Sequence, residues 1–369
     1  MKSIGLVFWL TMSVFAQAQT LNSGADHFIT TLTQVQIAAL PHTENLRPLS
    51  ADPIADCMDH LRQVTCLTDN GMGGSNNPAD CDPSRITPEM MKLFPDLLRV
   101  LPPFHLLVLC HVKQVRVHTH LFSIGYASEL RDANHKPIGT MIGVRLDVLL
   151  GSNPNHDIWS WKEQLNFGLS KMNDPDYTTS PLGPNMHERV GGSDSLLATV
   201  FVHEVGHLID FLNKANVEDC KADKAAGVAN CTSPADSFTA LSWGTSVTYK
   251  LNSDDPPPEW VALYPWLSQM CYYSCTKTIA PANIPDVYSE LSKSGLLTSY
   301  SARDPMEDFA EASMIHSLKK AALPFSYFIL GAGGATLYDF DTQWVAPQVQ
   351  AKRLWLEKFF ARTDLAYDF

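Results

Sequence analysis

Residues 193–215 read SDSLLATVFVHEVGHLIDFLNKA and predict a long buried helix. Ser193, Asp194 or Ser195 can cap the free N–H groups at its start. Apolar residues then cover most of the circumference of a helix, which is typical of a helix inside a protein core. These residues are Leu196, Leu197, Val200, Val202, Val205, Leu208, Ile209 and Leu212.

Two histidines and a glutamate lie in the middle of this helix. His203 and His207 are four residues apart, so they project from one face at a spacing that suits two corners of a metal tetrahedron. Glu204 lies on the flank, where its carboxylate can reach a water molecule at the metal without binding the ion. This is the arrangement of the HExxH metallopeptidases. Gly206 leaves room for close packing beside His207.

A catalytic zinc ion needs a third protein ligand and an open position. Asp210 and Asn213 stand where a metzincin would have Gly and His, so that class is excluded. The better source is a second helix, predicted from Pro305 to about Ala322. Glu307 and Glu311 share one face of it, and either could reach a metal.

Glu307 also has an alternative role. Asp304 as N-cap, Pro305 at the first helical position and Glu307 two residues later form a capping-box arrangement. In that role Glu307 bonds the cap, and Glu311 or no residue of this helix binds the metal. The spacing leaves these alternatives open.

Residues 299–312, SYSARDPMEDFAEA, closely resemble the second motif of gluzincins such as the catalytic domain of anthrax lethal factor. Residues 203–210, HEVGHLID, resemble the HExGHxxD helix of that family. The resemblance implies that His203, His207 and Glu307 bind zinc and that Glu204 is the general base. It also implies that Tyr300 stabilises the transition state and that Glu311 is a carboxylate behind a ligand.

The resemblance covers two short blocks and does not imply a substrate. One hundred residues separate His207 from Glu307, which is much longer than we expect for the family. Asp210 or Glu311 would orient a ligand imidazole through its second nitrogen. A surface or capping role for Asp210 is equally consistent with its position.

The composition excludes some classes of protein. The chain has 369 residues, 45% of them hydrophobic, which is enough for one large domain or two modest ones. The net charge of -12 argues against a nucleic-acid partner, which needs clustered Lys and Arg.

Residues 1–18 combine Lys2, an apolar run and Ala16-Gln17-Ala18, and predict a cleaved signal peptide. No later segment is apolar for long enough to predict stable membrane insertion.

The eight cysteines agree with export to a secreted or periplasmic location, since an even number behind a signal peptide predicts disulfides. Their clustering predicts that the first four pair among themselves, that Cys220 pairs with Cys231, and that Cys271 pairs with Cys275. A structural zinc site is the alternative, but it would require C-x2-C pairs, which do not occur.

We expect three parts: the signal peptide 1–18, a disulfide-bonded region 19–103, and a zincin-like catalytic domain 104–369 with a disulfide-bearing insertion at 216–298. The expected fold class is α+β, with a small mixed sheet, the HExxH helix and a mainly helical C-terminal part. Further expected elements are helices at 26–40, 88–101 and 346–362, and strands at 106–117, 120–127, 138–149 and 325–330.

Two other features have open interpretations. His118 and His120 alternate along an apparent strand, so they could form another metal site or ordinary strand surface. The strand at 139–149 could be an edge strand that holds an extended peptide by backbone pairing, or a plain core strand.

Together these observations predict an exported zinc endopeptidase that hydrolyses peptide bonds through a metal-activated water. Its partner would be a peptide or protein substrate; the oligomeric state is not predicted. A cell-wall peptide hydrolase with the same zinc chemistry is an alternative. A secreted binding or adhesion protein with a purely structural zinc is another, although such a site needs neither Glu204 nor Tyr300.

Overall fold

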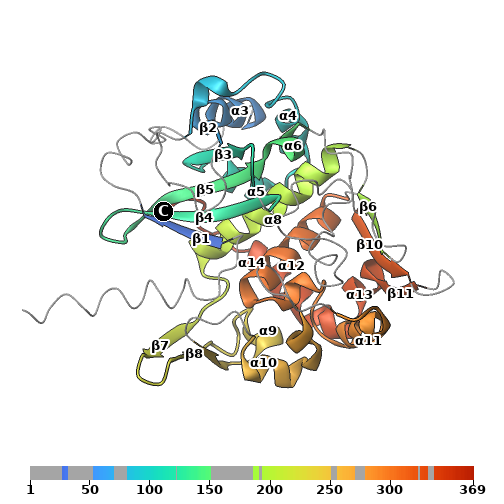
Figure 1. Cartoon of the computed structure of the whole chain (residues 1–369). Coiled ribbons are helices and arrows are strands. Elements are labelled where there is room, and N and C mark those ends of the chain that lie inside the picture. Colours follow the sequence, from blue (N-terminus) through green and yellow to red (C-terminus); the bar gives the residue numbers. More distant parts are fainter. Residues whose placement is uncertain are drawn as a thin grey trace, which may run out of the picture.

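The computed structural model describes residues 27–31, 53–69, 81–121, 123–150, 186–190, 193–250, 256–270, 279–322, 325–330 and 336–369. These residues form helices and three β-sheets, in agreement with the predicted α+β class (Figure 1). The predicted signal peptide at 1–18 lies outside the described residues.

The main sheet has five strands and is mixed, in agreement with the small mixed sheet that was predicted. Its five strands follow the order β1-β4-β5-β3-β2. β1 and β4 run parallel to each other, and β5, β3 and β2 run the opposite way. The strands are β1 (His27–Thr31), β2 (Thr65–Thr68), β3 (Gln114–His118), β4 (Gly125–Arg131) and β5 (Pro137–Arg145). β1 and β2 come from the expected N-terminal region, so the sheet continues across residue 103.

β5 occupies most of the strand predicted at 138–149, and α6 (Leu146–Leu149) follows it. β5 pairs with β4 on one side and with β3 on the other. The suggestion that this strand forms a free edge for a peptide is therefore wrong, because both of its backbone edges are already used. It is a core strand.

The N-terminal segment at 27–31 is a strand, not the start of the helix predicted over 26–40. Its backbone pairs in parallel with β4, from His27 opposite Ala127 to Thr31 opposite Arg131. Pairing with a strand distant in sequence has overridden a local helical pattern. Residues 32–40 lie outside the described part of the chain.

The prediction of a single strand over the apolar run 106–117 is wrong in its first half. Residues there form the helix α5 (Pro103–Leu109), and only β3 follows as a strand. Pro103 stands in the first turn of α5, where its missing N–H costs nothing. A short apolar run does not distinguish a buried helix from a buried strand. The strand predicted at 120–127 begins later, as β4 at Gly125.

The predicted central helix is confirmed as α8 (Ser193–Asn213). Every residue from Leu197 to Asp210 is buried, which agrees with its nearly all-round apolar character. In Figure 1 it crosses the middle of the molecule, with the five-stranded sheet on one side and α12 on the other. Helices α3 (Pro53–Val64) and α4 (Phe94–Val100) complete the upper part of the fold. α4 covers the second half of the helix predicted at 88–101.

The second predicted helix is confirmed as α12, with the expected cap. Asp304 accepts hydrogen bonds from the backbone N–H groups of Met306 and Glu307, and Pro305 is the first helical residue. The C-terminal part is mainly helical, as predicted. Its helices are α9 (Ala240–Trp243), α10 (Pro258–Leu263), α11 (Ile284–Lys293), α12 (Pro305–Lys320), α13 (Phe340–Val345) and α14 (Gln350–Phe360). Short 3-10 helices are η2 (Pro83–Arg85), η5 (Pro265–Gln269), η6 (Pro281–Asn283), η7 (Tyr300–Ala302) and η9 (Pro347–Val349).

A buried ion pair joins α14 to α12. Lys352 is 1% exposed and donates to both carboxylate oxygens of Asp308, at 2.5 and 2.6 Å. The indole N–H of Trp243 donates to the same carboxylate at 3.2 Å. The charge of Asp308 is thus compensated inside the core, and the ion pair links α14 to α12.

Two smaller antiparallel sheets complete the fold. One follows the order β11-β10-β6, and its strand β10 confirms the strand predicted at 325–330. The other, β7-β8-β9, lies in the expected insertion at 216–298. The strands are β6 (Met186–Val190), β7 (Asp219–Asp223), β8 (Val228–Thr232), β9 (Ser246–Lys250), β10 (Phe325–Leu330) and β11 (Thr336–Asp339).

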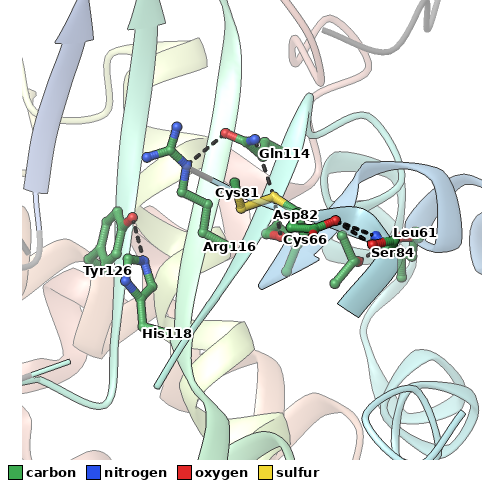
Figure 2. The surroundings of a disulfide bond; sticks show 11 residues. Leu61, Cys66, Cys81, Asp82, Ser84, Gln114, Arg116, His118 and Tyr126 are labelled. Atoms are coloured by element: carbon green, nitrogen blue, oxygen red, sulfur yellow. Dashed lines mark hydrogen bonds between the residues drawn. A yellow bond between two sulfur atoms is a disulfide. The ribbon is translucent and has the colours of Figure 1, made fainter. Parts of the chain in front are cut away.

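Two of the three disulfide predictions are confirmed, by three disulfides. The first four cysteines pair among themselves, as Cys57–Cys110 and Cys66–Cys81, and Cys220 pairs with Cys231 across β7 and β8. Figure 2 shows Cys66–Cys81 beside Gln114 and Arg116 of the neighbouring strand β3. The predicted Cys271–Cys275 pair lies outside the described residues.

In the parts of the chain that the structure describes, no helix combines the length and the apolar character that crossing a membrane requires.

Candidate metal centre

His203 and His207 lie one turn apart on the face of α8 that contacts α12. Their rings are perpendicular, with centroids 4.9 Å apart, and both side chains are buried. Glu204 is buried beside them, and one ligand atom from each of these three residues lies within 4.8 Å of the others. The helix thus presents two nitrogen donors and a carboxylate to one point, as its spacing predicted.

Glu307 reaches the same point from α12. Its Oε2 atom lies 3.3 Å from Nε2 of His203 and 3.3 Å from Nε2 of His207. Two atoms bonded to a tetrahedral zinc at about 2.0–2.1 Å lie about 3.3–3.4 Å apart. The Glu307 oxygen therefore lies at the distance from each histidine nitrogen that two ligands of one tetrahedral zinc would have.

The Oε2 atom of Glu307 also has the environment of a ligand atom. The side chain is 1% exposed, and Oε2 accepts no hydrogen bond from the residues that the structure describes. A buried carboxylate oxygen without a hydrogen bond is costly. A cation between Oε2 and the two imidazoles would remove that cost, so the residues present fit a bound metal.

The other oxygen of Glu307 is held by two donors. The Tyr300 hydroxyl donates to Oε1 at 2.9 Å, and the Arg303 guanidinium donates to it at 2.6 Å. The capping contact at this helix start is made by the Asp304 carboxylate, not by Glu307. Both oxygens of Glu307 thus have contacts other than the cap, which favours a ligand role over the capping alternative.

Burial alone would raise the pKa of Glu307. The neighbouring His207 and His203 and the cation Arg303 oppose burial and hold the pKa well below its usual range. Glu307 is therefore ionised at neutral pH, the state that a metal ligand requires.

Glu311 lies behind His203, one turn further along α12. Its Oε1 atom is 3.1 Å from Nδ1 of His203, and its Oε2 accepts a hydrogen bond from the Thr298 hydroxyl at 3.0 Å. Burial would lower the pKa of His203, but Glu307 and Glu311 raise it to about 10. Its contact with Nδ1 places Glu311 where a carboxylate could orient the His203 ring.

Glu204 lies against the first residue of β4. A methyl group placed on Gly125 would come within 2.9 Å of Oε1 of Glu204 and 2.8 Å of the Val200 side chain. Gly125 therefore provides the space in which the Glu204 carboxylate lies beside the two histidines.

Asp210 has contacts at the end of α8. Its Oδ1 accepts from the backbone N–H of Asn216 at 2.8 Å, and its Oδ2 accepts from the side chain of Asn216 at 2.8 Å. Asn216 in turn accepts a hydrogen bond from Thr239. Burial raises the pKa of Asp210 to about 6, although the Asn216 hydrogen bonds oppose this. These contacts bind the Asp210 carboxylate to the loop that follows α8.

Arg303 was not assigned a role from the sequence. It lies three residues after Tyr300 and four before Glu307, so the turn into α12 places all three side chains together. Besides Glu307 it contacts the Tyr300 hydroxyl at 3.2 Å. The available signal was the spacing itself, because a cation four residues before a carboxylate lies one helical turn away.

The other metal-site candidates are weaker. His118 is the last residue of β3 and is hydrogen-bonded to the Tyr126 hydroxyl at 3.0 Å, as Figure 2 shows, whereas His120 is exposed beyond the strand. One other group of possible ligands occurs among the described residues, namely Glu218, Cys220 and Cys231. Its two cysteines form a disulfide, so they are not available to a metal.

In comparisons with protein families, with curated proteins and with solved structures, the chain gives no match.

Proposed function

We propose that the chain is a zinc-dependent endopeptidase of the gluzincin type, with a zincin-like catalytic domain. One observation carries the proposal: Oε2 of Glu307 lies 3.3 Å from Nε2 of both His203 and His207. His207 and Glu307 come from two different helices and lie one hundred positions apart in the sequence, so the convergence is a property of the fold.

The set of donors supports zinc. Two imidazole nitrogens and one carboxylate oxygen are the protein ligands of a known class of catalytic zinc site, and such a site leaves one position open. Calcium and magnesium prefer sites made mainly of oxygen atoms. Glu204, a carboxylate beside the histidines, is a further component that a purely structural site does not need.

When bound, zinc would polarise the scissile carbonyl and lower the pKa of the attacking water. Glu204 would accept a proton from that water as its oxygen bonds to the carbonyl carbon. It would then deliver the proton to the amine nitrogen as the C–N bond breaks. Glu311 would keep the His203 ring in position through Nδ1.

Tyr300 would stabilise the negative charge that develops on the carbonyl oxygen. In the structure its hydroxyl donates to Glu307, so this role requires the hydroxyl to turn toward the substrate. Tyr300 is 2% exposed and its ring centroid lies 6.3 Å from that of His203, which keeps it close to the site.

We further propose that the protein is exported and acts on peptides or proteins outside the cytoplasm, in the periplasm or after secretion. The three disulfides fit an oxidising compartment. The residues at 1–18 that resemble a signal peptide support the same conclusion.

The test compares the wild-type chain with Glu204→Gln on an unfolded, fluorescently labelled casein. We expect about one zinc ion per chain in both, cleavage by the wild type, loss of cleavage on chelation, and no cleavage by Glu204→Gln. Glu129→Gln is the control, because Glu129 is also a buried glutamate but pairs with Arg131 on β4.

Two results would change the assignment. Cleavage of cell-wall peptides but not of casein would favour the cell-wall hydrolase. A chain with full zinc that cleaves neither substrate would favour a binding protein with a structural zinc.

A further inference from the structure

Arg303 is a buried cation at the base of the candidate metal site. Its side chain is 8% exposed and lies in the turn between η7 and α12. It donates to Oε1 of Glu307 at 2.6 Å and contacts the Tyr300 hydroxyl at 3.2 Å. A desolvated arginine is costly unless its partners are well placed. Its contacts with two residues of the candidate site point to a role there.

The two oxygens of Glu307 have different tasks. Oε2 faces both histidines, whereas Oε1 accepts hydrogen bonds from Arg303 and Tyr300. A carboxylate can bind a metal through one oxygen or through both. Donors that hold Oε1 favour binding through Oε2 alone, which leaves a further position at the metal open for water and substrate.

Tyr300 cannot be the permanent donor to Oε1 if its hydroxyl turns to the substrate during reaction. Arg303 is independent of that movement, because its own hydrogen bond to Oε1 does not pass through the Tyr300 hydroxyl. With Arg303 in place, Oε1 keeps a charged donor while the tyrosine is away. Without Arg303, Oε1 would have no donor while the Tyr300 hydroxyl is turned away, and it would turn toward the metal.

We propose that Arg303 is a positioning residue that keeps Glu307 bound through one oxygen and allows the Tyr300 hydroxyl to leave it. The proposal rests on the proposed metal site. Arg303 acts through Glu307 and Tyr300 and does not itself contact the reacting atoms.

The surroundings of Arg303 suit this role. The Asp304 carboxylate lies 3.8 Å from its Nε atom, and the guanidinium carbon lies 5.9 Å from the centre of the Tyr300 ring. The guanidinium is thus held between two carboxylates and beside an aromatic ring. A lysine would keep the charge but lose this planar contact with several groups.

The test replaces zinc by cobalt(II), whose visible absorption becomes weaker when a four-coordinate site becomes five-coordinate. Spectra are recorded for the wild type, Arg303→Met and Arg303→Lys. Arg131→Met is the control. Arg131 also pairs with a glutamate, Glu129, but it is the last residue of β4, at the other end of the strand from Gly125 and the candidate site. Zinc affinity is measured for each by competition with a chelator, and kcat and KM are measured on a peptide.

We expect the cobalt absorption of Arg303→Met to weaken, and its zinc affinity and kcat to fall about 10- to 100-fold with little change in KM. Arg303→Lys should lie between it and the wild type, and Arg131→Met should equal the wild type. In the Tyr300→Phe background, Arg303→Met should weaken the spectrum further, since Oε1 then has neither donor.

An unchanged cobalt spectrum in Arg303→Met, with unchanged zinc affinity, would overturn the proposal. If Arg303→Met does not fold, the same comparison in Arg303→Lys decides the question. The spectrum does not depend on turnover. A cobalt-binding chain that cleaves no substrate would therefore refute the peptidase function and leave the role of Arg303 to be judged from the spectrum alone.

Discussion

Gly206 of α8 lies directly against Ala310 of α12. A methyl group on Gly206 would come within 3.2 Å of the Ala310 Cα atom and 2.5 Å of the Ser313 hydroxyl. Gly206 precedes His207, and Ala310 lies between Glu307 and Glu311. The close approach of the two backbones therefore sets the distance between the histidines and the glutamates.

Gly206→Ala should separate the two helices at the metal site. We expect a loss of stability of about 1–3 kcal/mol from overpacking and a fall in zinc affinity of about tenfold or more. Denaturant unfolding and chelator competition measure the two effects. Gly295→Ala is the control, because its added methyl would have only moderately close neighbours, the nearest being the Ser242 hydroxyl at 3.3 Å. Equal zinc affinity in the two variants would mean that the helix contact does not set the ligand geometry.

Glu307→Gln and Glu311→Gln should have different effects. Glu307 faces both Nε2 atoms, so its variant should lose most of its zinc. Glu311 contacts only the Nδ1 side of His203, so its variant should keep zinc and lose about 10- to 100-fold in activity. Metal analysis after dialysis and peptide cleavage separate the two. The opposite result would restore the capping role of Glu307 and make Glu311 the ligand.

Tyr300→Phe should lower kcat by about 10²- to 10³-fold while KM changes little, because the hydroxyl would act where charge develops in the transition state. Zinc content should be retained, since Arg303 still donates to Oε1 of Glu307. Steady-state kinetics with metal analysis check both points. An increase in KM with an unchanged kcat would assign Tyr300 to substrate binding instead.

The stability of the protein should fall in acid partly because of His105. Burial and, as a smaller cause, the nearby His316 lower the pKa of His105 to about 3; Ser317 is hydrogen-bonded to its ring. The unfolded chain takes up a proton near pH 6.5 and the folded chain does not, so stability is lost as pH falls from about 6.5 toward 3. The loss from this group should be on the order of 3 kcal/mol at pH 4.

His105→Gln should remove that part of the pH dependence, as measured by urea unfolding between pH 4 and pH 8. The exposed His120 provides the control, and His120→Gln should leave the pH dependence as it is in the wild type. If His105→Gln shows the wild-type pH profile, the acid sensitivity belongs to other groups.

Local signals in the sequence were reliable where the element was long or strongly capped. α8 has apolar residues around its circumference, and α12 has Asp304 and Pro305 at its start, so both helices could be located. Short apolar segments were not reliable. Residues 27–31 became a strand and part of 106–117 became a helix, because pairing and packing with distant residues outweigh weak local preferences.

The sequence by itself determined the chemistry of α8. Two histidines at one-turn spacing must share a face, and Glu204 must lie beside them, whatever surrounds the helix. It also determined which cysteines could pair by proximity along the chain, as in Cys220–Cys231.

Only the tertiary structure decided between Glu307 as a cap and Glu307 as a neighbour of the histidines. That choice depends on the packing of α12 against α8 at Gly206, which no local pattern specifies. The same packing revealed Arg303, because its partners become visible only when both oxygens of Glu307 have been placed. Spacing along a helix is set by backbone geometry, whereas a contact between helices depends on the whole core.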